Sequence, residues 1–309
     1  MLQPEPLPRI AVVGAGAVGG YFGGQMARSG ASVVMIGRRP FVDAVNSKGL
    51  YLETLQFQET VRVEASTELS AVRGAEIVLL CVKTTDTADT ARELAPLLAP
   101  NAVLVSLQNG VDNAERIRAA SGLDAVRAVV YVAAAVKAPG HIQHFGRGDL
   151  VIGPETAPTK RLAAQFVRGG VPCRVSSNIE GELWVKFIAN CALNPVSAIG
   201  QAQYGRIADS PNAVKLLEMV GDEVLAVARA AGIALPGVED RAAALAVSMK
   251  IATQMREQLS STGQDLNRGK RTEIESLNGH VVRRGAELGV PTPANHALYT
   301  LVELLEGQK

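Results

Sequence analysis

Short, almost uninterrupted apolar runs recur through the first part of the chain. They cover residues 10–13, 31–37, 74–83, 102–110, 126–136, 149–153 and 171–176. Runs of this kind are typical of strands that are buried on both faces of a sheet. Between them lie segments with apolar residues at helical spacing, such as 17–29, 87–100 and 159–170. The alternation predicts an open α/β sheet with helices on both faces.

The pattern changes near residue 178. Strand-like runs stop there, and Ala, Leu, Glu and Arg at helical spacing dominate segments such as 214–232 and 272–289. These residue types favour helices. We therefore predict two domains, an α/β domain of Rossmann type over residues 1–177 and an all-α domain over residues 178–309.

Composition narrows the kind of partner. The 309 residues include 31 basic and 30 acidic side chains, for a formal net charge of +1, so no overall field attracts nucleic acid or an anionic membrane. The longest apolar run, 128–136, is too short to cross a bilayer as a helix. Prolines in residues 1–9 interrupt any secretory signal, and three widely spaced cysteines indicate reduced thiols. We expect a cytoplasmic protein with a small-molecule partner.

A glycine-rich turn follows the first apolar run. Gly14, Gly16 and Gly19 have the spacing G-x-G-x-x-G between a predicted strand and a predicted helix. The first permits the tight turn, the second lets the backbone approach a pyrophosphate, and the third lets the helix pack on the strand. A glycine turn without a ligand is the alternative, but the run at 31–37 completes a βαβ unit. The residues expected to hold a dinucleotide are Gly14, Ala15, Gly16, Ala17, Val18 and Gly19.

The end of the second predicted strand indicates which dinucleotide binds. An NAD site usually has Asp or Glu there for the ribose 2′-hydroxyl, whereas this chain has Gly37, Arg38 and Arg39, with no carboxylate before Asp43. A guanidinium binds phosphate oxygens through paired donors. We therefore predict NADP as the cofactor, with Arg38 on its 2′-phosphate and Arg39 as the second candidate. Two solvated arginines are the alternative.

Two polar residues follow predicted strands at the edge where such sheets bind ligands. Lys83 ends the run at 74–83, and Asn109 lies near the end of the run at 102–110. Ligands of open α/β sheets lie beyond the carboxyl ends of the strands, so both residues are candidates for cofactor contacts. Either residue could instead cap a turn, since Asn-Gly is a common turn pair.

Three polar side chains recur at intervals of four in the apolar segment 183–195, namely Lys186, Asn190 and Asn194. Four residues of a helix turn by about 400°, so the three side chains form one stripe. A positioned ammonium can act as a proton donor in catalysis. The alternatives are a solvated lysine, buried amides with partners inside the protein, and a helix end or kink at Pro195.

The histidines do not predict a metal site. His141 and His144 have the spacing of half a site, but no third ligand follows at suitable spacing. We therefore predict no metal.

Six motifs, in order along nearly the whole chain, resemble the ketopantoate reductase family. They are GAGAVG, CVKTTDT, LQNGVD, ELWVKFIANCALNP, RTEIE and SLNGH. The resemblance implies an enzyme that uses NADPH to reduce 2-dehydropantoate (ketopantoate) to (R)-pantoate, in the pathway to pantothenate and coenzyme A.

The resemblance also implies roles for single residues. Lys186 would be the catalytic general acid. Ser261 matches a substrate-contacting serine, but SSTG stands where the family usually has SSML, so Thr262 and Gly263 leave its position open. Substrate-binding residues implied in this way are Asn109, Asn190, Asn194, Ser261 and Glu273.

Glu273 precedes Leu277 by four residues and Val281 by eight, which predicts that it lies on the apolar face of a helix. An acid in that place needs a partner, such as a substrate hydroxyl or Lys186.

Two other functions stay open at this point. The chain could reduce another 2-oxo acid with NADPH, or it could be a non-catalytic NADP-sensing protein of the same fold. Lys186 together with Glu273 argues against a sensor, which needs neither residue. A homodimer is also possible.

Overall fold

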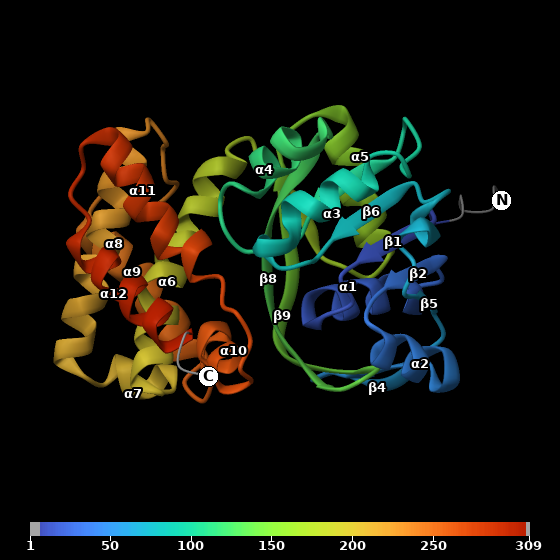
Figure 1. The fold of residues 1–309 in the computed structure, drawn as a ribbon, viewed down its shortest axis with the longest axis horizontal. Helices are drawn as coiled ribbons and strands as arrows, with labels where there is room; N and C mark the ends of the chain where they lie inside the picture. The colour runs from blue at the N-terminus through green and yellow to red at the C-terminus, as the bar shows by residue number, and fades with distance from the viewer. Residues whose placement is uncertain (1–6, 307–309) are drawn as a thin grey trace. The chain divides into compact units, whose positions relative to one another are not determined.

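A computed structural model describes residues 7–306, and the chain divides into two compact units between Ile179 and Glu180 (Figure 1). Most of the proline-containing segment at the N-terminus, residues 1–6, lies outside the described residues. The first unit is α/β and the second is helical. The predicted fold class, a Rossmann-type domain followed by an all-α domain, is confirmed.

One ten-stranded sheet forms the first unit. Its order is β4-β3-β9-β8-β7-β6-β1-β2-β5, and β10 pairs with β9. Six neighbouring strands pair in parallel, in the order β8-β7-β6-β1-β2-β5. The bounds are β1 Ile10–Val13, β2 Val33–Ile36, β3 Leu50–Glu53, β4 Gln58–Val61, β5 Glu64–Ser66, β6 Ile77–Leu80, β7 Val103–Ser106, β8 Ala125–Ala138, β9 His141–Gly153 and β10 Cys173–Val175.

Helices cover both faces of this sheet, which explains the unbroken apolar strands. In β1, Ile10 and Val12 pack into one core cluster and Ala11 and Val13 into the other. Helix α1 contributes Phe22 to the first cluster, while α3 and α4 contribute to the second. The helices are α1 Ala17–Arg28, α2 Arg39–Lys48, α3 Thr87–Leu94, α4 Asn113–Ser121 and α5 Ala157–Arg168, with 3-10 turns η1 Leu69–Val72 and η2 Thr84–Asp86.

The longest strands of the sheet exceed their predicted lengths. β8 and β9 form an antiparallel hairpin, and β9 begins at His141 rather than at the predicted residue 149. The register of the hairpin shifts at three places, and in residues 141–148 polar residues and glycines interrupt the apolar residues Ile142 and Phe145. The short strands β3, β4 and β5 were not predicted, because their partly exposed residues give no continuous apolar run.

The second unit consists of helices. Helix α6 continues through Pro195 to Gly200, so the alternative of a helix end at this proline is wrong. None of the helices within residues 7–306 is long and apolar enough to cross a membrane. The bounds are α6 Ile179–Gly200, α7 Tyr204–Ala208, α8 Pro211–Ala230, α9 Arg241–Gln254, α10 Ser261–Asn267, η3 Ile274–Ser276, α11 Asn278–Leu288 and α12 Pro293–Glu306.

Candidate functional site

The glycine-rich turn connects β1 to α1 with no room for side chains at two of its three glycines. Gly14 has a φ of +100°, and a Cβ there would lie 2.7 Å from the backbone C of Cys81 and N of Val82. A Cβ at Gly19 would lie 2.3 Å from the carbonyl O of Gly14. Both positions therefore require glycine, one for the turn and one for the close approach of α1 to β1.

Gly16 is different, because its missing side chain leaves open space. It is the N-cap residue of α1, and a Cβ there would have no atom within 4 Å. The first turn of α1 has no acidic residue, so no carboxylate of that turn opposes an anion at the positive end of the helix. Ala15 anchors the turn through its N–H, which donates to the Ile36 carbonyl (3.0 Å). The turn thus has room for a phosphate group beside Gly16, and half-buried Ala17 and Val18 form the first turn of α1. Dinucleotide binding by Gly14 to Gly19 stays a prediction.

Arg38 follows β2 next to this turn. It is exposed and is the N-cap residue of α2, whose first turn has no acidic residue. A Cβ at Gly37 would lie 3.0 Å from Cβ of Ala15, so the end of β2 packs directly on the glycine-rich turn. Asp43 lies inside α2 and is exposed. The structure therefore places a guanidinium, and no carboxylate, at the strand end that normally selects the ribose.

The loops after β6 and β7 bring Lys83 and Asn109 into one region. Lys83 is the N-cap residue of η2, and the neighbouring Thr84 donates its Oγ1 hydrogen to the Asn109 carbonyl (3.1 Å). Both strands are parallel neighbours in the sheet, so their carboxyl ends lie at the same edge. Sequence reasoning missed the buried polar residues beneath these loops, among them Gln108, although CVKTTDT and LQNGVD contained the signal.

Helix α6 carries the predicted polar stripe. Lys186 and Asn190 are half-buried, and Asn194 is buried. The Asn194 Oδ1 accepts a hydrogen bond from the Tyr204 hydroxyl (3.2 Å). Burial raises the pKa of Tyr204, so this hydroxyl keeps its proton as a donor. Asn194 thus has a partner inside the helical unit, which the sequence left open.

The serines before α10 differ in their environment. Ser260 is buried and caps the helix by accepting from the Gly263 N–H (3.0 Å), and its Oγ donates to the Asn194 carbonyl (3.0 Å). Ser261, the predicted substrate contact, is the first residue of α10 and is exposed. Thr262 is buried. The departure SSTG therefore does not prevent this helix, because the Ser260 cap holds its first turn.

Glu273 does not lie on a helix, and the predicted placement on an apolar helix face is wrong. It precedes the 3-10 turn η3 and is half-buried, and α11 begins only at Asn278. Leu277 between them has φ −101° and ψ −101°, which lies outside the helical region. The spacing from Glu273 to Leu277 and Val281 therefore does not place the three side chains in one row.

Asn278, in the SLNGH motif, supports α6 from α11. Its Nδ2 donates to the Cys191 carbonyl (3.0 Å) and to Asn295 Oδ1 (3.0 Å), and both asparagines are fully buried. Asn295 donates in turn to Glu223, whose carboxylate also accepts the N–H of Ala294 (2.8 Å) in the first turn of α12. These bonds join α6, α8, α11 and α12.

His141 and His144 contact protein groups. His141 Nε2 lies 2.7 Å from Glu53 Oε2, and His144 Nε2 lies 2.8 Å from the Arg147 carbonyl while its ring stacks on Tyr21. Within residues 7–306 no group of three or more His, Cys, Asp or Glu is placed to hold a metal ion. The cysteines Cys81, Cys173 and Cys191 are free thiols.

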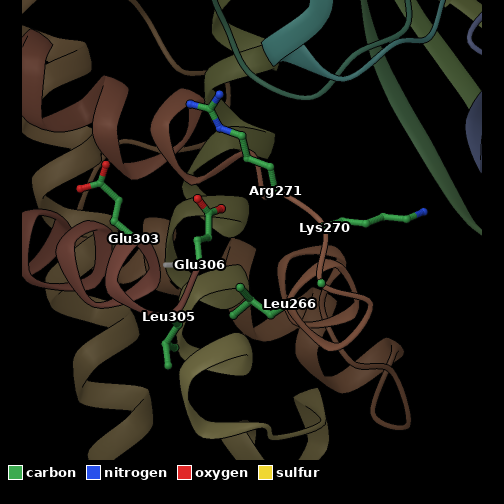
Figure 2. Close-up of a pocket in the computed structure, with 7 residues that line it drawn as sticks. Leu266, Lys270, Arg271, Glu303, Leu305 and Glu306 are labelled. Carbon is green, nitrogen blue, oxygen red and sulfur yellow. The ribbon is translucent and has the colours of Figure 1, made fainter. Parts of the chain in front are cut away.

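A pocket of about 410 Å³ lies in the helical unit between the segment after α10 and the last turns of α12 (Figure 2). Lys270 and Arg271 supply positive charge, and Glu303 and Glu306 supply negative charge. The Thr272 N–H donates to Glu306 Oε1 (2.6 Å) and so ties the two walls together. None of the predicted site residues lines this pocket; its lining is Leu266, Gly269, Lys270, Arg271, Glu303, Leu305 and Glu306.

Comparison with known proteins gives a family match for each of the two units. The family described as ketopantoate reductase PanE/ApbA matches residues 10–156, and its C-terminal family matches residues 178–306. A 2-dehydropantoate 2-reductase of Pyrococcus horikoshii is 30% identical over 302 residues, which cover 96% of this chain and 97% of the relative.

Solved structures agree as well. A PanE/ApbA family ketopantoate reductase from Ralstonia eutropha JMP134 is 49% identical with a TM-score of 0.91, over 97% of this chain and 99% of the other. A D-mandelate dehydrogenase solved with NADH and anilino(oxo)acetate has a TM-score of 0.90 at 22% identity, over 97% and 98% of the two chains, and shares the fold. The two family matches and the full-length relative establish that this chain belongs to the ketopantoate reductase PanE/ApbA family.

Proposed function

We propose that the protein is an NADPH-dependent 2-dehydropantoate 2-reductase, which reduces ketopantoate to (R)-pantoate for pantothenate and coenzyme A synthesis. Family membership and full-length relatives of that name support the reaction. The observation that carries the proposal in the structure is the glycine cradle, in which Gly14 and Gly19 permit no side chain and Gly16 opens onto free space. The α/β residues 1–177 would bind the cofactor and residues 178–309 the substrate.

The choice of NADP over NAD rests on Arg38. It is exposed at the end of β2, next to the glycine-rich turn, where an NAD enzyme normally has a carboxylate. Its guanidinium can bind the 2′-phosphate through two donors, and the N-terminus of α2 adds a favourable dipole. Gly14 to Gly19, Lys83 and Asn109 would hold the rest of the cofactor.

A nicotinamide cofactor held by these residues would supply a hydride for the ketone carbon. Negative charge then develops on the ketone oxygen, and Lys186 would donate the proton that neutralises it. Asn190 and Asn194 would offer amide groups to the oxo acid, and Ser261 would contact the carboxylate of the oxo acid. Glu273 would accept a hydrogen bond from a substrate hydroxyl. Asn109 belongs to both sets of contacts.

The direct test is NADPH oxidation with ketopantoate, followed by a panel of other branched or hydroxylated 2-oxo acids. We expect ketopantoate to give the highest kcat/KM of the panel and (R)-pantoate to be the product. A higher kcat/KM with another 2-oxo acid would identify that acid as the preferred substrate and would leave the proposed type of reaction unchanged. NADPH binding without turnover of any acid would instead support an NADP-sensing protein.

Two properties stay predictions from the sequence. The possible homodimer can be checked by light scattering of the purified chain, and the cytoplasmic location by fractionation of cells that express it.

A further inference from the structure

A buried hydrogen-bond network lies beneath the two loops that carry Lys83 and Asn109. Its side chains come from the end of β7 and the loop after it, from η2 and the first residue of α3, and from the first residue of α4. Each of them is at most 6% exposed; they are Thr84, Thr87, Ser106, Gln108 and Asn113. Buried polar groups of this kind are costly unless all of them have partners.

Gln108 is the centre of the network and uses its whole amide. Its Nε2 donates to the Val82 carbonyl (3.0 Å) and to Thr87 Oγ1 (2.7 Å), and its Oε1 accepts from Ser106 Oγ (2.9 Å). Turning the amide over would set its oxygen against the Val82 carbonyl, which has no hydrogen to donate. The orientation of Gln108 is therefore fixed.

The remaining bonds continue in one direction to Asn109. Thr87 Oγ1, which accepts from Gln108, donates to Asn113 Oδ1 (3.3 Å), and Asn113 Nδ2 donates to the Asn109 carbonyl (2.7 Å). That carbonyl also accepts from Thr84 Oγ1 (3.1 Å). A network in which every member has its donor and acceptor restricts the backbone of both loops.

The network holds the chain on both sides of Lys83. Gln108 fixes the carbonyl of Val82, the residue before Lys83, and Thr84, the residue after it, is bonded to Asn109. Asn109 itself follows Gln108 directly. One set of buried bonds therefore sets the positions of Lys83 and Asn109 relative to each other.

We propose that Gln108 is a positioning residue for the nicotinamide cofactor, one that acts through Lys83 and Asn109 without touching the cofactor. The inference rests on the proposed function, in which both of these residues bind the cofactor. Groups that are already held in the bound arrangement lose less conformational freedom on binding. Loosening them should therefore weaken NADPH binding.

The experiment compares variants of the network by fluorescence titration with NADPH. Gln108→Leu keeps a similar size and removes all three bonds, and we expect its Kd for NADPH to rise about tenfold or more, which corresponds to about 1.4 kcal/mol. Thr87→Val should raise the Kd in the same direction, while Thr87→Ser keeps the hydroxyl and should bind nearly as the wild type does. Ile117→Val, in the fully buried core of α4, is the control for lost stability alone.

A second readout needs no cofactor. Hydrogen exchange of residues 82–87 should be faster in Gln108→Leu and Thr87→Val than in wild type, and unchanged in Thr87→Ser and Ile117→Val. Because Thr87→Val and Thr87→Ser test the same network, a Gln108→Leu protein that failed to fold would leave the comparison intact.

Non-additivity separates positioning from a general loss of stability. In a Lys83→Met, Asn109→Ala background, adding Gln108→Leu should change the Kd by less than about threefold, since the groups it positions are gone. If Gln108→Leu raised the Kd as much in that background as in the wild type, the inference would be overturned. A wild-type Kd in Gln108→Leu and Thr87→Val would also overturn it. Wild-type protein that binds NADPH but reduces no oxo acid would overturn the proposed function while the comparison of Kd values still tests Gln108.

Discussion

Asn278 Nδ2 lies 3.0 Å from the carbonyl oxygen of Cys191, the acceptor that Pro195 leaves without a helical donor. In a continuous helix the N–H of residue 195 would donate to the carbonyl of residue 191, but proline has no N–H. The buried amide of Asn278 replaces that donor from α11. The hydrogen bond from Asn278 allows α6 to continue past Pro195, and it keeps Asn194 in the same helix as Lys186.

Removing this replacement donor should destabilise the protein. We expect Asn278→Leu to lower the free energy of unfolding by about 2–3 kcal/mol, because the Cys191 carbonyl and Asn295 both lose a buried partner. Pro195→Ala restores an N–H donor to α6 and should recover part of that loss in the double variant. Urea unfolding measures the coupling, and the exposed Asn267→Leu is a control. Strictly additive effects would contradict the role given to Asn278.

Gly16 and Gly19 should respond differently to alanine. Gly16→Ala places a methyl group in open space, so the thermal stability should change little while NADPH affinity falls, because the pyrophosphate can no longer approach. Gly19→Ala places a Cβ 2.3 Å from the Gly14 carbonyl, so both stability and affinity should fall. Differential scanning fluorimetry and NADPH titration distinguish the two. Equal losses of stability would argue against the open cradle at Gly16.

Arg38 should determine the preference for NADPH. We expect Arg38→Ala to weaken NADPH binding by about ten- to a hundredfold, since a charged hydrogen bond to phosphate is lost, and to leave NADH binding nearly unchanged. The neighbouring Arg39, which is also exposed, provides the matched control Arg39→Ala, which should have the smaller effect. An identical loss for both dinucleotides would show that Arg38 does not contact the 2′-phosphate.

Lys186 should be required for turnover rather than for cofactor binding. Lys186→Ala should lower kcat by roughly 10²–10⁴ with little change in NADPH affinity or Tm. Lys186→Arg should recover little, since a guanidinium hardly releases a proton at neutral pH. The exposed Lys215→Ala on α8 is a control. Wild-type rates in Lys186→Ala with ketopantoate and the other 2-oxo acids would exclude Lys186 as the proton donor.

The three cysteine thiols, of which Cys191 is buried and Cys81 and Cys173 are half-buried, should make the protein sensitive to alkaline pH. Burial raises the pKa of Cys81 and Cys191, and that of Cys173 to about 12. The folded protein therefore holds these protons more tightly than the unfolded chain does. This contribution to stability is complete below the unfolded thiol pKa of about 8.5 and is lost as pH rises from there through the folded values. We expect the Tm to fall progressively above that pH, and less steeply when the three cysteines are replaced by alanine; equal slopes would contradict this account.

Local constraints made much of the α/β unit predictable from the sequence. The glycine turn at Gly14 and Gly19, and the absence of a carboxylate before Asp43, depend on residues close together in the chain, and the structure has the turn where it was predicted. The alternating cores of the sheet follow from unbroken apolar strands such as β1 and β6. These features need no knowledge of distant partners.

The misplaced and missed features depend on tertiary contacts. The predicted helix at 272–289 is interrupted at Leu277, and the next residue, Asn278, bonds to Cys191 and Asn295 on other helices. The network around Gln108 joins loops that are 21 to 26 residues apart. Neither spacing nor propensity in one segment reveals such partners, because tertiary contacts override local preference.

The sheet order also has a consequence for the growing chain on the ribosome. Strand β3 pairs in parallel with the start of β9, and Gln143 of β9 follows Glu53 of β3 by 90 residues. At translation rates of roughly 5–20 residues per second, the start of β9 is synthesised roughly 5–18 s after β3. Leu50 and Leu52, fully buried in the finished protein, have only β4 as a strand neighbour during that interval. We therefore expect the antiparallel pair β3 and β4 to be the region where nascent chains depend most on chaperones.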